Sequence, residues 1–180
     1  MAAQAKNSLR RPARSRDRRR SGNVIIETVF TMLPMLAFIF AFFDFGMLFF
    51  RWSTLQNAVR EGCRYAITFQ TVTGDGQDAS IESVVQTYAM GIVKTTDSPQ
   101  TIYVNYYAPS ALSTAITTGG NVPGNVVEVS VQGVPWNRLA PISGSFANGA
   151  FFRNTTPVNL NVYSSDVLGG YPAGVSSVTR

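Results

Sequence analysis

The residues that could carry chemistry in this chain are few, and their types exclude most catalytic sites. The chain has no histidine, so it cannot form a Ser-His-Asp or Cys-His nucleophile system, a histidine-containing zinc site or a histidine general base. Its lone cysteine, Cys63, can form no disulfide within the chain, and its small and apolar neighbours favour a buried thiol over a bridge between subunits. We therefore expect no catalytic residue, no cofactor and no metal ligand.

Two carboxylates stand out because of their surroundings. Glu27 and Asp44 lie within residues 24–50, a stretch that is otherwise chiefly apolar. A charge at the centre of a bilayer costs about 2.5–3.5 kcal/mol, so an acid in such a stretch indicates a function. We expect Glu27 to pair with a neighbouring subunit during assembly, or alternatively to reach the inner headgroups beside the preceding arginines. Asp44 falls about 26 Å further along a helix, near the outer interface, where it either pairs with a neighbour or stays hydrated.

The apolar stretch predicts a transmembrane helix over residues 23–50. Residues 24–50 span about 40 Å as a helix, enough to cross a hydrocarbon core of about 30 Å, and Pro34 is expected to kink or loosen it. Residues 1–22 form a leader with eight basic residues and one acid, whereas the remainder has seven basic and nine acidic residues. The positive-inside rule places this leader in the cytoplasm. Because the positive charge is confined to the leader, we expect no nucleic-acid partner.

The leader, a glycine and the first membrane residues follow one another in a recognisable order. The basic leader ends at Gly22, and Asn23, three apolar residues and Glu27 precede the long apolar helix. This order resembles type IV pilin-like prepilins, in which a membrane prepilin peptidase cuts after the glycine. The resemblance implies Gly22 and Asn23 as processing residues. The new amine of Asn23 could then pair with Glu27 of a neighbouring subunit, which makes both charges tolerable in the membrane.

A second motif lies at the end of the apolar stretch. Residues 44–66 read DFGMLFFRWSTLQNAVREGCRYA, an acid-Phe-Gly step followed by a mixed polar and apolar run. Together with Glu27 and Pro34, this run resembles TadE-like proteins, which are minor pilin-like components of the tight-adherence (Tad, or Flp) pilus system. Thr28 departs from the family's cleavage pattern, which has an aromatic residue after the glutamate. The matching residues in the run are Asp44, Phe45, Gly46, Leu55, Gln56, Asn57, Ala58, Arg60, Glu61, Gly62, Arg64, Tyr65 and Ala66.

The resemblance implies a minor pilin-like subunit, or pseudopilin, that is not an enzyme and that assists filament assembly, adhesion or secretion through helix packing. Its partners would be other pilin-like subunits, the pilus assembly machinery and prepilin peptidase. It would be a single-pass protein of the bacterial cytoplasmic (inner) membrane, associated with the pilus. One alternative is an uncleaved, signal-anchored scaffold of the same apparatus. A remote alternative is a membrane-anchored carboxylate enzyme or glycan-binding module that uses Asp75, Asp78, Glu82 or Glu128, although no paired acids support it.

Residues 51–70 predict an amphipathic extension of the membrane helix. Apolar residues recur at helical spacing, and a stripe of small residues lets another helix approach closely. This face packs either on a neighbouring helix of a bundle or on the protein's own domain, and the sequence leaves both open. The apolar face comprises Leu48, Trp52, Leu55, Val59, Cys63 and Ala66, and the small-residue stripe comprises Ala58, Gly62 and Ala66.

Residues 71–180 predict an extracytoplasmic α+β domain. A polar break over residues 71–79 ends the long helix, and Ser80 is expected to cap a second helix that runs to about Lys94. Runs of β-branched residues between Gly, Pro, Asn and Ser then predict three strands. We expect a small antiparallel sheet laid on the helix, in a pilin-like layout. The expected strands are Thr101–Tyr107, Asn125–Val134 and Pro157–Tyr163.

Overall fold

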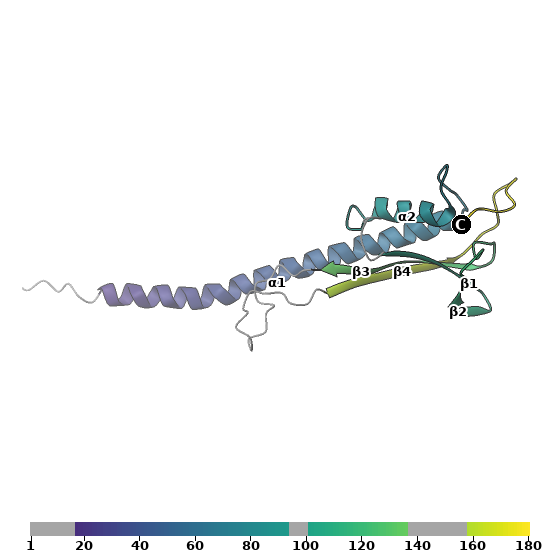
Figure 1. The fold of residues 1–180 in the computed structure, drawn as a ribbon. Helices are drawn as coiled ribbons and strands as arrows, with labels where there is room; N and C mark the ends of the chain where they lie inside the picture. Colours follow the sequence, from purple (N-terminus) through teal and green to yellow (C-terminus); the bar gives the residue numbers. More distant parts are fainter. Residues whose placement is uncertain (1–16, 94–100, 137–157) are drawn as a thin grey trace, which may run out of the picture.

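The computed structural model describes residues 17–93, 101–136 and 158–180, which form a two-layer domain with a long helix projecting from it (Figure 1). Two helices make one layer and a four-stranded antiparallel sheet makes the other, so the expected α+β arrangement is confirmed. Residues 1–16 of the leader, Lys94 and Pro157 lie outside the described residues. The elements are α1 (Asp17–Ala66), α2 (Gln77–Tyr88), β1 (Ile102–Ala108), β2 (Ala111–Ala115), β3 (Val126–Trp136) and β4 (Val158–Val167).

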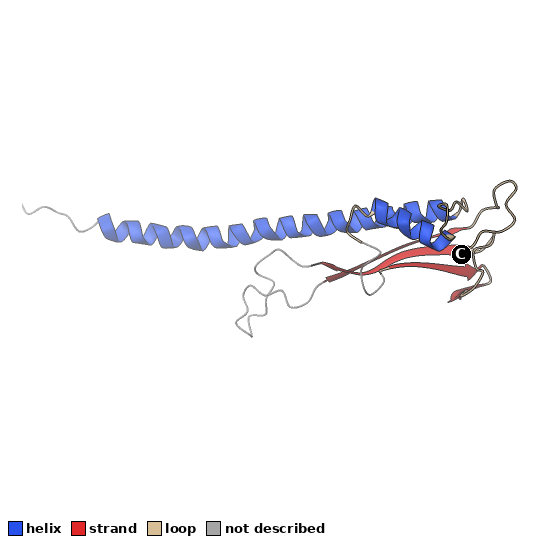
Figure 2. Cartoon of the chain, turned by 45° about the horizontal axis from the view of Figure 1, so that its top comes forward, coloured by secondary structure: helices blue, strands red, loops and turns tan. Residues whose placement is uncertain are grey.

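Helix α1 is continuous over 50 residues and has two environments. Its first part projects away from the domain, and its last part is enclosed between α2 and the sheet (Figure 2). The helix passes through Pro34, although this residue lacks the N–H for one backbone hydrogen bond. It ends at Ala66 rather than at residue 70, because Phe69 takes a positive φ of 53° and buries its ring against Tyr171, with 4.6 Å between the ring centroids.

The core lies between the last four turns of α1, helix α2 and the inner face of the sheet. Most of the predicted apolar face of α1 is fully buried there, whereas Trp52 is 42% exposed. Leu48, one turn before Trp52 on the same face, is partly buried against the core. The fully buried core residues include Leu55, Val59, Ile81, Val85, Tyr106, Val127, Val129 and Val131.

Helix α2 begins at Gln77, three residues before the predicted start at Ser80. The prediction of Ser80 as the cap is wrong: its hydroxyl donates to the carbonyl of Gly76 at 2.8 Å and accepts from the backbone N–H of Val72 at 2.9 Å. The Gln77 side chain, fully buried, donates to the carbonyl of Ala66 at 3.0 Å. This tertiary contact joins the ends of the two helices and explains why the second one starts early.

The sheet has the order β2-β1-β3-β4, and all neighbouring strands are antiparallel. The sequence predicted three of these strands and missed β2, whose five residues are all exposed and show no inward-outward alternation. Strand β4 continues to Val167, beyond the predicted end at Tyr163. Strands β3 and β4 shift register at a bulge where Gly133 takes a φ of 73° and donates its N–H to Asn161 Oδ1 at 2.8 Å.

Cys63 links α1 to the sheet. Its side chain is 2% exposed, and its thiol donates to the carbonyl of Ser164 on β4 at 3.0 Å. Two turns earlier in α1, Gln56 donates to the carbonyl of Tyr163 at 3.1 Å. Burial raises the pKa of the Cys63 thiol, so less of the reactive thiolate is present at a given pH.

We predict that Gly62→Ala lowers the free energy of unfolding by about 1–3 kcal/mol, the usual cost of overpacking. A methyl group at this position would lie 2.6 Å from Val85 Cγ2 and 3.4 Å from Val129 Cγ1. Gly46→Ala is the matched control, because it changes the same helix where no such atom lies within 4 Å. Thermal unfolding of the full chain in detergent micelles measures both; an equal change in Tm for the two variants would contradict this packing.

We also predict that Cys63 reacts with iodoacetamide at pH 8 only after the domain unfolds. Both its burial and its raised pKa slow the reaction of the folded protein. Mass spectrometry of the full chain with and without denaturant measures the modified fraction. Rapid modification of the folded chain, or a disulfide-linked dimer on a non-reducing gel, would refute the buried position.

Candidate functional site

The residues predicted to take part in processing and assembly, Gly22, Asn23 and Glu27, lie on the projecting part of α1. The helix begins at Asp17, so the peptide bond between Gly22 and Asn23 lies within helical backbone. A peptidase that cuts here must first open the helix locally, and Gly22 lowers the cost because glycine is about 1 kcal/mol less favourable than alanine in a helix. Asn23 and Glu27 are one turn apart, and both are exposed. They therefore share one face of the helix near its N-terminal end.

The polar residues near Glu27 are satisfied within the helix. Thr28 donates its hydroxyl to the carbonyl of Val24 at 2.8 Å, and Thr31 donates to the carbonyl of Glu27 at 3.0 Å. Threonines bonded in this way can face lipid or another apolar helix without leaving an unpaired hydroxyl. Glu27 is thus the polar group in this part of the helix that calls for an external partner.

The projecting part of α1 is apolar on all sides. Phe30, Phe38 and Phe42 are 77%, 78% and 76% exposed, and their exposed neighbours include leucine, isoleucine and methionine. The segment Asn23–Ala66 is long and apolar enough to cross a membrane, and its most apolar window has no residue buried in the protein. A helix that is apolar all round requires an apolar environment on every side, so it fits a single-pass membrane anchor.

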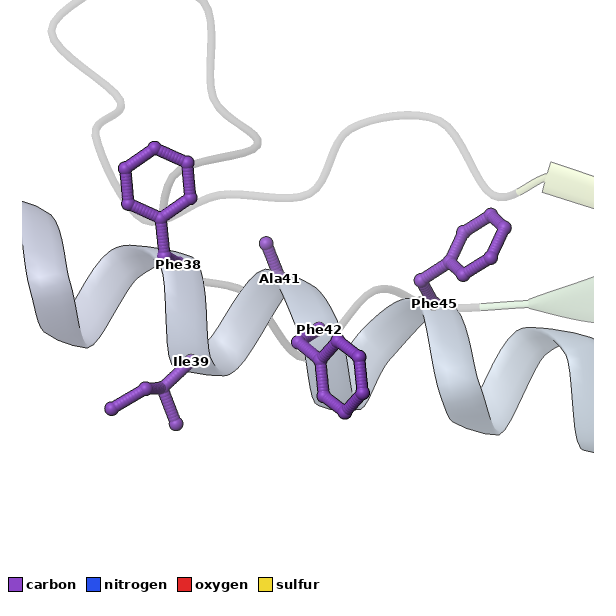
Figure 3. A pocket seen from close by; sticks show the side chains of 5 residues that line it. All are labelled: Phe38, Ile39, Ala41, Phe42 and Phe45. Carbon is purple, nitrogen blue, oxygen red and sulfur yellow. The ribbon is translucent and has the colours of Figure 1, made fainter.

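A shallow apolar hollow interrupts this surface (Figure 3). Phe38 and Phe45 project from the same side of the helix, and the small Ala41 lies between them. Ile39 and Phe42 complete the lining. The hollow has room for a side chain of another helix, or for a lipid chain, between the rings of Phe38 and Phe45.

Asp44 differs from the rest of the projecting helix. Among residues 23–50, all of which the structure describes, it is the one buried side chain, with 9% exposed. The phenylalanines on both sides of it, Phe43 and Phe45, are 61% and 67% exposed. The acid of the acid-Phe-Gly step therefore lies on the side of α1 that the protein itself covers, and the rings face outward.

The residues of the family motif divide between the core and the surface. Leu55 is fully buried, and Gln56 reaches the backbone of β4. Asn57 and Arg60 are exposed, and Tyr65 is half-buried against the core. Arg64 and Glu61 form a surface ion pair at 3.2 Å, which contributes little to stability.

The small-residue stripe of α1 is occupied by the protein's own second helix. Ala58 and Ala66 are fully buried, and Gly62 lies directly beneath Val85 and Ile81 of α2. The sequence left open whether this stripe packs on a neighbouring subunit or on the protein's own domain. The structure places α2 and β3 against it, so this stripe packs on the protein's own domain.

A polar cluster that the sequence did not indicate joins the last residues of the chain to α2. Asp78 accepts a hydrogen bond from the Tyr106 hydroxyl at 2.7 Å and forms an ion pair with Arg180 Nε, also at 2.7 Å. The Arg180 guanidinium also stacks over the Tyr106 ring, 4.8 Å from its centroid, and donates to the carbonyls of Ile116 and Thr117 at 3.0 Å. Burial, and then the bond to Asp78, raises the pKa of Tyr106, so this phenol stays protonated. The cluster is a structural tie.

The four acids considered for a carbohydrate-processing site do not come together. Asp78 is committed to Tyr106 and Arg180, whereas Glu128 lies on the opposite layer, in β3. Glu128 accepts a hydrogen bond from Tyr107, and partial burial together with this carboxylate raises the pKa of that tyrosine. Across residues 17–93, 101–136 and 158–180, no group of three acids or cysteines is arranged to hold a metal ion.

Comparison with known proteins supports the resemblance seen in the sequence. The family model described as TadE-like protein matches residues 22–64, which run from the processing glycine through the projecting helix into the buried part of α1. No curated protein and no solved structure matches the chain. The TadE-like family is not an enzyme family and suggests association with the machinery of the Tad pilus. Residues 22–64 are therefore similar to TadE-like proteins, in agreement with the resemblance seen in the sequence.

Proposed function

We propose that this protein is a minor pilin-like subunit of a Tad pilus, which acts through helix packing in the cytoplasmic membrane. The observation that carries the proposal is the division of α1 into two parts. Residues 23–50, called the rod below, are mostly exposed and apolar, whereas the last part of the same helix is the central element of a folded domain. The TadE-like match spans both parts. The rod inserts among other pilin-like subunits, and the domain remains outside the membrane.

The exposed rod cannot remain in water at a reasonable cost. Complete burial of one phenylalanine side chain is worth about 1.5–3 kcal/mol, and phenylalanine recurs along the whole rod. Phe30, Phe38, Phe42, Phe43, Phe45, Phe49 and Phe50 are each more than half exposed. In a bilayer these rings face lipid, and in a filament they face the rods of neighbouring subunits. Transfer between these two apolar environments needs little hydrophobic energy, which suits a subunit that moves from membrane to filament.

Glu27 supplies the directional contact that an apolar rod lacks. Cleavage after Gly22 removes the arginine-rich leader, which holds the helix end at the inner leaflet, and creates a cationic amine on Asn23. The amine and Glu27 are one helical turn apart on one chain. A neighbour displaced along the axis can therefore bring its amine to this carboxylate, and the paired charges fix the register of the two helices.

We predict that the mature protein begins at Asn23 and that Gly22→Ala blocks processing, because the peptidase requires the small residue before the cleaved bond. Intact mass and N-terminal sequencing of protein from native membranes, with and without prepilin peptidase, measure this. Gly46→Ala, a second glycine of the same helix, is the control and should be processed normally. If the wild-type chain begins near Met1 in both strains, the protein is an uncleaved, signal-anchored scaffold and the subunit model is wrong.

We further predict that Glu27→Ala leaves membrane insertion intact but lowers recovery of other pilin-like subunits with the protein by about tenfold, since about 1.4 kcal/mol corresponds to that factor. Glu27→Asp should retain part of the effect because it keeps the charge. Thr31→Ala is the matched control: it lies one turn further, and its hydroxyl is bonded within the helix. Co-purification from cross-linked membranes and counts of surface pili measure assembly; normal piliation of Glu27→Ala would exclude the pairing role.

A further inference from the structure

The sheet has a second face that the two helices do not cover. On β1, β3 and β4 the buried side chains, such as Val104, Val129 and Val162, lie on the face that packs against the two helices, so the residues between them lie on the opposite face. The strand register places these outward residues in rows across the sheet. The outer sheet face is defined here by two such rows: Tyr103, Ser130 and Tyr163, and then Asn105, Glu128 and Ser165.

The first row has an aromatic ring on each side of a small residue. Tyr103 is 37% exposed and Tyr163 is 71% exposed, whereas Ser130 between them is 2% exposed. The amide of Gln132 donates to the Ser130 hydroxyl at 3.1 Å, which fixes the floor between the rings. The two tyrosines stand on strands that are two spacings apart, or about 10 Å. They form a flat platform that is open to solvent.

The charges of this platform restrict what can bind to it. Glu128 is the single charged residue in the two rows, and neither row contains a cation. Aromatic platforms that bind nucleic acid are lined by basic residues, and adhesion to anionic lipid also requires them. Ser130 is buried, so Glu128 and Asn105 are the polar groups that the middle of the platform offers, whereas the centre of a stable protein interface is apolar and poor in charge. The charges therefore disfavour an anionic ligand, and the rings favour a polar ligand that can pack flat against them.

We propose that the outer sheet face binds an extended, uncharged oligosaccharide. The C–H faces of sugar rings pack on Tyr103 and Tyr163, which offer aromatic surface with a negative face. The sugar hydroxyls accept from and donate to the amide of Asn105 and donate to the carboxylate of Glu128, both in the row next to the rings. A single sugar cannot reach both tyrosines, so the site requires a chain. This proposal concerns the domain alone and does not depend on the assembly role of Glu27.

The position of the platform keeps it accessible in an anchored protein. The platform lies on the face of the sheet opposite the buried core residues. Figure 2 shows that α1 leaves the domain at one end of the sheet. The described helices thus cover the inner face only, and the packing of the apolar rod against lipid or other rods leaves the outer face free. A subunit held by its rod could present the platform to a neutral glycan outside the cell.

The test uses the full chain in phosphatidylcholine nanodiscs, titrated separately with cellohexaose, chitohexaose and maltohexaose and followed by calorimetry and by saturation-transfer NMR. We expect one of these hexasaccharides to bind and its monosaccharide not to bind. Tyr163→Ala and Tyr103→Ala should each weaken binding by about tenfold, whereas Tyr163→Phe should keep it within about twofold because the ring remains. Tyr88→Ala is the matched control, since this tyrosine is 46% exposed on α2, in the other layer.

Binding of none of the three hexasaccharides to the wild-type chain would overturn the proposal. So would an unchanged affinity of Tyr163→Ala, or an effect of Tyr88→Ala as large as that of Tyr163→Ala. If Tyr163→Ala instead abolishes self-association of the chain and no sugar binds, the face is a contact between copies. Melting of each variant in the same nanodiscs verifies the fold. These outcomes are separate from piliation, so failure here leaves the Glu27 experiment unaffected.

Discussion

A single continuous helix has to satisfy two different environments, and the rest of the structure follows from that constraint. Over its first part, α1 presents mostly exposed apolar side chains, with Asp44 buried and Leu48 packed against the core. Over its last part, one side is buried and the other carries Asn57, Arg60 and Arg64 toward solvent. The change occurs between Asp44, the first buried residue, and Leu55, the first fully buried residue of the core. The domain therefore cannot move independently of the membrane segment, because the backbone that joins them is a helix rather than a linker.

The domain is organised around the closest approach of its two helices. Gly62 allows α2 to lie directly on α1, and the buried Gln77 side chain connects the start of α2 to the end of α1. The sheet then closes the other side through Cys63 and Gln56, which donate to the backbone of β4. Because side chains of α1 contact both α2 and the sheet, this helix is the shared element of the core. Gly62 therefore packs within the core of the domain, although its small size would also suit a contact between subunits.

The division of labour along the chain has a functional consequence. The proposed assembly contacts lie on the rod, where Glu27 and the phenylalanines are exposed, and the proposed ligand platform lies on the sheet, on the side away from α1. The cluster of Asp78, Tyr106 and Arg180 ties the last residues of the chain to the two layers between which they lie. This tie holds β1, the strand that carries Tyr103, to the start of α2. Packing in a filament and recognition at the surface can therefore occur in one subunit without competing for residues.

The sequence by itself determined the features that depend on local pattern. The apolar run, the arginine leader and the position of Glu27 were enough to predict the membrane helix and its expected orientation, because hydropathy and charge act over short stretches. The alternation of valines predicted strand β3, and the order of predicted helices and strands predicted the α+β class. Strand β2 was missed because its residues are all exposed, so burial imposes no alternation on them. Only the tertiary structure decided the start of α2, which depends on the buried contact of Gln77, and the partner of the small-residue stripe around Gly62. It also decided the polar cluster of Asp78 and Arg180 and the row of Tyr103 and Tyr163, because residues far apart in sequence meet only through strand register and packing.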